Sequence, residues 1–161
     1  MLRLDVATIV ELSTGENTSG QSVAQAILSD GRLWGRILTS TGVNLGGGGM
    51  VAGVRGTSVS VIKEAGVTYI SIPHSTKPTA AANVICTSVG VTHETQMSPG
   101  DILSDSSTCI TTTPGTSSLY LTSDWVRDNT RKDLIYLDPI ATPTTLAEVA
   151  VTDPSPIDIR R

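Results

Sequence analysis

Residues 33–38 read Leu-Trp-Gly-Arg-Ile-Leu, residues 46–61 read Gly-Gly-Gly-Gly-Met-Val-Ala-Gly-Val-Arg-Gly-Thr-Ser-Val-Ser-Val, and residues 67–72 read Val-Thr-Tyr-Ile-Ser-Ile. Apolar and polar side chains alternate on both sides of Ala65-Gly66. Such alternation is typical of strands with one buried face, and a short connection that contains Gly joins antiparallel strands. The stretch therefore predicts a β-hairpin at the centre of an all-β fold.

The composition favours β-structure throughout the chain of 161 residues. Apolar residues make up 39% of the sequence and the mean hydropathy is +0.10, which argues against a wholly disordered protein. Phe is absent, with only two Trp and three Tyr, so Val, Ile, Leu and Ala must fill the core. β-branched side chains fit a pleated sheet better than a helix. We expect one all-β domain over residues 1–138 and a Pro-rich extended arm over residues 139–161.

The charge limits the classes of partner. A net charge of −4 and an isoelectric point of about 5.0 argue against nucleic-acid binding, which needs a basic face, and against anionic membrane surfaces. The sequence contains no run of about 18 apolar residues, so we expect no membrane insertion. Met1–Asp5 reads as a strand and not as a secretory signal. The chain is then either cytosolic, or a mature form or fragment without its signal.

Turn residues divide the rest of the chain into short elements. Ser22–Leu28 fits either a short strand or one helical turn, and the tight turn predicted at Ser29-Asp-Gly would make a hairpin with the next strand. The charged segment Asp124–Asp133 fits either a short helix or a solvated turn. Further strands are expected at Leu4–Leu12, Arg32–Thr39, Asn83–Val91, Thr108–Thr113 and Ser118–Thr122.

Four consecutive glycines, Gly46–Gly49, allow two interpretations. A loop that cradles phosphate needs a helix directly after it, whereas the residues after Gly49 read as a strand. We therefore favour a connection that is flexible or too closely packed for side chains.

Cys86 and Cys109 are the two cysteines, each within a strand-like run. One interpretation is a disulfide between neighbouring strands in an oxidising compartment. The other is a pair of buried free thiols that act as small apolar residues.

The C-terminal arm is the candidate for contact with a neighbouring molecule. Prolines interrupt residues 153–161 and exclude a helix or a central strand. Residues 146–151 are apolar enough to add as a strand to the sheet edge of a neighbour. The expected assembly residues are Leu146, Val149, Val151, Ile157 and Ile159.

Three segments in order resemble the FecR-like domain. They are Met1-Leu-Arg-Leu-Asp-Val-Ala-Thr-Ile-Val-Glu-Leu, Gly31-Arg-Leu-Trp-Gly-Arg-Ile-Leu and Val51-Ala-Gly-Val-Arg-Gly-Thr-Ser-Val-Ser-Val. That family carries an Arg-Leu-Asp-x-x-Thr-x-Val-x-Leu strand, a Gly-x-x-Trp-x-Arg strand and an Ala-x-Val-Arg-Gly-Thr turn. The resemblance covers about residues 1–72. It implies a rolled or solenoid-like all-β domain and an extracytoplasmic location, whether extracellular, periplasmic or at the cell surface.

The matching segments also suggest structural roles for individual residues. Trp34 is expected to cap the core. Arg55 is expected to turn inward and bond carbonyl groups of a neighbouring strand, with Gly56 giving room and Thr57 completing the motif. The alternative is that Arg55 is an exposed charge on a strand.

No constellation of catalytic residues stands out, so we expect no enzyme, no cofactor and no metal site. His74 and His93 are expected in polar loops, and His93-Glu94 has no third ligand at a suitable spacing. The sequence has no Gly-x-Ser-x-Gly nucleophile motif.

Two pairs of carboxylates read as solvated turns and not as acid–base dyads. Basic neighbours neutralise Asp124 and Asp128. For Asp101 and Asp105, a weak Ca²⁺ site is the alternative, although no loop motif for that ion is present.

These observations predict a non-enzymatic extracytoplasmic β module that acts by protein–protein contact. It would be a self-assembling surface or filament subunit, with itself as a homo-oligomer or another surface protein as its partner. One alternative is a periplasmic signalling domain of the FecR type that binds a receptor domain. A further alternative is a carbohydrate-binding or enzymatic domain, although this chain has few of the aromatic residues that carbohydrate sites usually expose. The last alternative is a viral structural protein with an OB-like domain.

Overall fold

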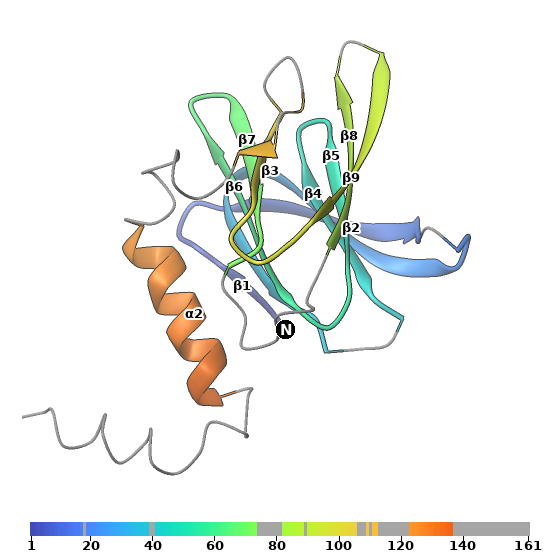
Figure 1. Cartoon of the computed structure of the whole chain (residues 1–161). Coiled ribbons are helices and arrows are strands. Elements are labelled where there is room, and N and C mark those ends of the chain that lie inside the picture. Colours follow the sequence, from blue (N-terminus) through green and yellow to red (C-terminus); the bar gives the residue numbers. More distant parts are fainter. Residues whose placement is uncertain are drawn as a thin grey trace, which may run out of the picture.

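The computed structural model describes residues 1–17, 19–38, 41–73, 82–88, 90–105, 109, 111–112 and 123–136. These residues form one sheet of eleven strands and a helix (Figure 1), which confirms the all-β prediction. The strands are β1 (Leu2–Leu4), β2 (Ile9–Glu16), β3 (Ser22–Arg36), β4 (Val43–Gly47), β5 (Met50–Val54), β6 (Ser58–Glu64), β7 (Val67–Ser71), β8 (Ala82–Ser88), β9 (Val91–Met97), β10 (Ile102–Ser104) and β11 (Thr111–Thr112), and the helix is α2 (Asp124–Tyr136).

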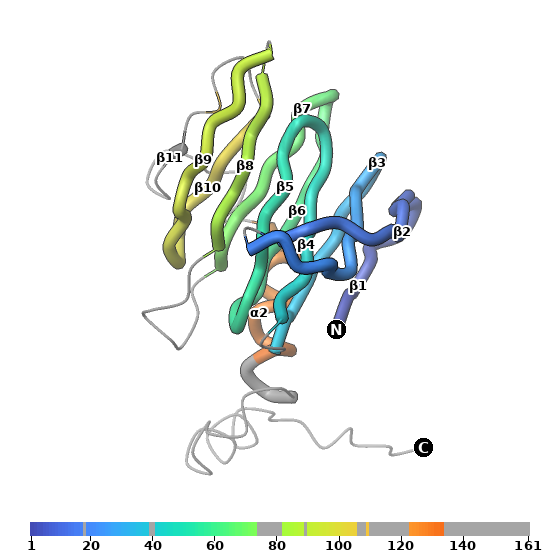
Figure 2. Tube along the Cα trace, turned by 90° about the vertical axis from the view of Figure 1, so that its right-hand side faces the viewer, coloured from blue at the N-terminus to red at the C-terminus, as the bar shows by residue number. Residues whose placement is uncertain are grey.

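The sheet rolls up around the long strand β3, as Figure 2 shows. Its order is β11-β10-β7-β6-β3-β4-β5-β8-β9, with β1 and β2 paired along β3 as well. The first part of β3 lies between β2 and β4, and its second part lies between β1 and β6. Every pair is antiparallel except β3–β4, which is parallel. The two halves of the sheet therefore share one strand.

The prediction of a hairpin at Ser29-Asp-Gly is wrong, because β3 continues through these residues. Gly31 takes a φ of 89°, and a side chain there would collide with Thr8. The hydroxyl of Thr8 instead accepts a hydrogen bond from the backbone N–H of Arg32 at 3.2 Å. The partner strand is interrupted at the same level, so the single strand predicted at Leu4–Leu12 is divided into β1 and β2. Asp-Gly here redirects a strand and does not end it.

The hairpin predicted around Ala65-Gly66 is confirmed as β6–β7. Both turn residues have positive φ, 51° and 80°, as two-residue hairpin turns require. The strand predicted at Asn83–Val91 is present as β8 but ends at Ser88, and Val91 begins the next, antiparallel strand β9.

The glycine run forms the turn of the hairpin β4–β5 and is closely packed. A Cβ at Gly46 would overlap the carbonyl oxygen of Met50, and one at Gly49 would overlap that of Thr87. Gly48 has a φ of 58° and lies against Asp105. The residues after the run form the strand β5, where a phosphate loop would need the start of a helix.

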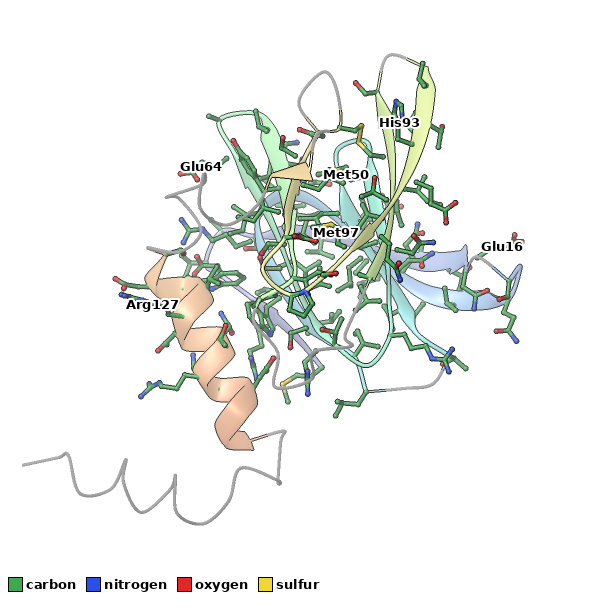
Figure 3. The ribbon with its side chains drawn as sticks, viewed as in Figure 1. Glu16, Met50, Glu64, His93, Met97 and Arg127 are labelled. Atoms are coloured by element: carbon green, nitrogen blue, oxygen red, sulfur yellow. A yellow bond between two sulfur atoms is a disulfide. The ribbon has the colours of Figure 1, made fainter. Side chains whose placement is uncertain are left out.

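Most of the core lies inside the rolled sheet, where Met50 and Met97 are fully buried (Figure 3). A smaller cluster lies between the outer face of the sheet and α2. It contains Trp34, Ile62, Ile102 and Val126, and Trp125 packs its ring edge against the Trp34 ring with 6.1 Å between centroids. The sequence predicts that Trp34 caps the core, and in the structure Trp34 packs against α2. A short helix is one of the two structures that the sequence allows for Asp124–Asp133.

The predicted pairing of the two cysteines is confirmed, but the bond does not join neighbouring strands, because Cys109 lies outside the strands. Cys86 on β8 is bonded to Cys109, their Cα atoms are 6.1 Å apart, and both residues are buried. The bond closes a loop of 23 residues, which on the chain-entropy account is worth about 3 kcal/mol.

The helix α2 begins at Asp124, and its exposed face carries ion pairs between neighbouring turns. Arg127 pairs with Asp124, and both Arg131 and Lys132 pair with Asp128. The two carboxylates are thus neutralised by basic neighbours, as the sequence predicts. No helix in the described ranges is long and apolar enough to cross a membrane.

Candidate interaction surface

The described part of the chain leaves two long strands unpaired on one side. β2 pairs only with β3, and β9 pairs only with β8. Both are edges of the same half of the sheet, β2-β3-β4-β5-β8-β9. The hairpin β2–β3 projects from the body on the right of Figure 1, and Glu16 marks its tip in Figure 3. An unpaired strand presents a row of backbone N–H and C=O groups to another chain.

The edge formed by β1 and β2 is unusually apolar for an exposed strand. On β2, Leu12 is 71% exposed whereas Val10 packs against the core, and Val6, in the turn between β1 and β2, is 86% exposed. Neither β2 nor β9 contains Lys or Pro, the residues that commonly prevent edge-to-edge pairing. The exposed apolar residues of this edge are Met1, Leu2, Leu4, Val6, Ile9 and Leu12.

A buried polar network holds this edge against α2. The carboxylate of Asp133 accepts hydrogen bonds from the Trp34 indole N–H at 3.0 Å and from the Ser58 hydroxyl at 2.5 Å. Arg3 on β1 pairs with the other oxygen of Asp133 at 2.7 Å, and it donates to the backbone carbonyl of Asn129 at 3.2 Å. Asp133 is 5% exposed. The network therefore fixes β1, β3, β6 and α2 relative to one another.

Sequence reasoning placed Asp133 only at the end of a charged segment and missed this network. The available signal was the indole N–H of Trp34, because a buried Trp normally finds an acceptor. Nothing in the spacing indicates which carboxylate that acceptor is, since Trp34 and Asp133 are 99 positions apart.

All four residues expected to have structural roles lie in the described part of the chain, and Arg55 does not take the role expected for it. Trp34 and Thr57 are fully buried, and Gly56 has the positive φ of 69° that a turn requires. Arg55 is exposed, so the prediction that it turns inward is wrong. Arg55 is exposed because β5 ends at Val54. It therefore lies in the connection to β6, where no strand directs its side chain toward the core. Its side chain lines a polar cavity of about 150 Å³.

The carboxylates considered for a Ca²⁺ site bond the backbone instead. Asp101 accepts a hydrogen bond from the N–H of Ser98 at 2.7 Å, and Asp105 accepts one from the N–H of Thr68 at 2.9 Å. Within the described ranges, no three His, Cys, Asp or Glu side chains are close enough to hold a metal ion. His93, near the top of Figure 3, is exposed but lies on β9 opposite Cys86, so the prediction of a loop there is wrong.

The remaining predicted residues cannot be placed. His74 and the strand at Ser118–Thr122 lie outside the described residues. So does the whole arm, with the expected assembly residues Leu146, Val149, Val151, Ile157 and Ile159.

The chain matches no protein-family model, no curated protein and no solved structure. The function must therefore be argued from the residues and surfaces described above.

Proposed function

We propose that this chain is a non-enzymatic protein–protein interaction module that self-associates by pairing β2 with β2 of a second copy. The observation that carries the proposal is the unprotected edge of β2, where exposed apolar side chains accompany a free row of backbone groups. Edge pairing supplies affinity through backbone hydrogen bonds and register through side chains.

The sequence of β2 is complementary to itself when two copies run antiparallel about Leu12. In that register Leu12 faces Leu12 of the second copy, and Val10 faces Thr14. Glu11 faces Ser13, so no two glutamates oppose each other within the paired strands. An interface of this kind has twofold symmetry, the commonest arrangement in soluble homo-oligomers.

The second free edge, β9, extends this association into a longer assembly. Antiparallel pairing about Thr95 places Glu94 opposite Gln96 of the next copy and again avoids facing like charges. Two separate twofold contacts on one subunit generate a chain without a fixed end when their axes do not intersect. This supports the surface or filament subunit expected from the sequence.

An extracytoplasmic location is part of the proposal. It is supported by the Cys86–Cys109 bond, since stable disulfides form mainly in oxidising compartments, and by the resemblance of residues 1–72 to the FecR-like domain. A signalling domain of the FecR type that binds a receptor domain is the alternative function, and it calls for a monomer in isolation.

The test is the molar mass of the purified chain by light scattering over a range of concentrations, with the same chain carrying Leu12→Lys. We expect dimers or larger species that dissociate in the variant, because two lysines would meet at the symmetry axis. Leu38→Lys is the matched control, since Leu38 is also an exposed leucine but lies after β3, outside both free edges. A monomer at all concentrations would contradict self-association and favour the receptor-binding alternative.

A further inference from the structure

A row of polar side chains crosses the outer face of the half-sheet that carries the free edges. The residues are in register on six consecutive strands, so that each faces the next. Hydrogen bonds link Gln25 to Ser13 at 3.4 Å and Asn44 to Gln25 at 3.5 Å. The row consists of Ser13, Gln25, Asn44, Gly53, Asn83 and Gln96.

The cavity lined by Arg55 includes three residues of this row, Asn44, Gly53 and Asn83. Gly53 leaves a gap between the side chains of Asn44 and Asn83, and the cavity of about 150 Å³ lies over the gap. Amide and hydroxyl groups surround it, and Arg55 is its one ionised residue among the described lining. The described lining contains no carboxylate, but the side-chain amide of Asn83, which is part of the lining, donates a hydrogen bond to the carboxylate of Glu94.

The hydrogen-bonding groups that remain available define the ligand. Asn44 is 6% exposed, and its amide N–H groups are used by the backbone carbonyl of Glu16 at 2.9 Å and by Gln25. Its carbonyl oxygen has no partner among the described residues, and it lies 3.9 Å from the position that a Cβ on Gly53 would occupy. Arg55 has no hydrogen bond or ion pair within the same part of the chain. The cavity thus offers an unpaired amide oxygen and an unpaired guanidinium among the described residues.

A ligand that satisfies both groups needs a hydroxyl donor and a carboxylate. The guanidinium of Arg binds carboxylates through two parallel hydrogen bonds. The cavity is smaller than the roughly 300–1,000 Å³ of sites for whole small molecules, so it suits one unit of a longer chain. The polar row continues from the cavity toward both sheet edges, at the strand spacing of about 4.8 Å, and offers hydrogen bonds to the units on either side.

We propose that the outer face of β2-β3-β4-β5-β8-β9 binds an acidic polysaccharide, with one uronic acid unit in the cavity beside Arg55. Its carboxylate pairs with Arg55 and one of its hydroxyls donates to the carbonyl oxygen of Asn44. The row contains no aromatic side chain, so binding depends on charge and hydrogen bonds and not on stacking. The cavity lies on the face of the sheet, whereas self-association uses the backbone edge of β2, so variants of Arg55 and of Leu12 test the two proposals separately.

The experiment is a calorimetric titration of the full chain with a short oligogalacturonate and, separately, with its methyl ester, which is the same sugar without the charge. We expect binding of the acid form only. Arg55→Gln should weaken it about tenfold, because a hydrogen bond between charged groups is lost. Gly53→Ala should also weaken it, since the added methyl group stands on the cavity floor without a collision. Arg131→Gln, which removes an exposed charge on α2, is the control and should bind normally.

Three results would overturn the proposal. The first is no binding of the acid form by a chain that circular dichroism shows to be folded. The second is equal binding of the acid and its ester, or of the wild type and Arg55→Gln. The third is tighter binding of an oligoglutamate peptide than of the sugar, which would assign the face to acidic proteins.

Discussion

The indole N–H of Trp34 donates a hydrogen bond to Asp133 across 3.0 Å, and this bond joins the middle of the sheet to the last helix of the described chain. Asp133 also binds Ser58 and Arg3, so one carboxylate satisfies donors from three strands. A buried charge with this many partners is costly to disturb, because removing it leaves several buried donors without an acceptor.

Asp133→Ala should lower the free energy of unfolding by about 3 kcal/mol or more. The measurement is urea denaturation followed by Trp fluorescence, which reports on Trp34 and Trp125 in the same cluster. Asp128→Ala on the same helix is the control, because its ion pairs are exposed and should be worth about 0.5 kcal/mol. Equal losses in the two variants would mean that the buried network does not stabilise the fold.

Breaking the disulfide should destabilise the chain by about 3 kcal/mol. The double variant Cys86→Ser, Cys109→Ser and the reduced wild type should unfold at similar urea concentrations, both below that of the oxidised wild type. The reducing agent should leave the double variant unchanged. If reduction alone has no effect on the wild type, the loop between the two cysteines is held by other contacts.

Gly48→Ala should cost more stability than Gly66→Ala. Both glycines have positive φ, 58° and 80°, so the backbone strain of about 1 kcal/mol is common to both. The Cβ at Gly48 would collide with Asp105, whereas nothing lies within 4 Å of a Cβ at Gly66. The difference between the urea midpoints of the two variants therefore measures the cost of the collision between the Cβ at position 48 and Asp105. Equal midpoints would show that Asp105 moves aside without cost.

Deleting residues 139–161 separates two versions of self-association. If β2 pairs with β2, the truncated chain should keep its molar mass in light scattering, and Leu12→Lys should still dissociate it. If the arm of one copy occupies the edge of another, the deletion should produce monomers by itself. The second outcome would replace the β2 pairing with the exchange expected from residues 146–151.

The sequence predicted local structure well where neighbouring residues decide it. The hairpin around Ala65-Gly66 and the packed glycine turn both follow from backbone preferences within a few residues. Arg55 shows the limit of a motif, because its position in the turn depends on β5 ending at Val54 and not on the motif alone.

The long-range features could not be predicted, because they depend on contacts between residues that are far apart in the sequence. Asp-Gly is a frequent hairpin turn, yet here Thr8 packs against Gly31 and keeps β3 continuous. The network of Asp133 and the polar row that includes Asn44 and Gly53 arise only when distant strands are brought into register. Alternation within one strand says which side chains share a face, but not which strand lies beside it.

The continuity of β3 has a consequence for how the molecule opens. Because its 15 residues run from one half of the rolled sheet into the other, a continuous strand joins the two halves. Its pairing with β6 and the parallel pairing with β4 join segments distant along the chain, so folding requires slow long-range search before either half gains stability. Amide protons along β3 should therefore exchange with solvent together, and only through global unfolding, while those of α2 exchange sooner by local opening.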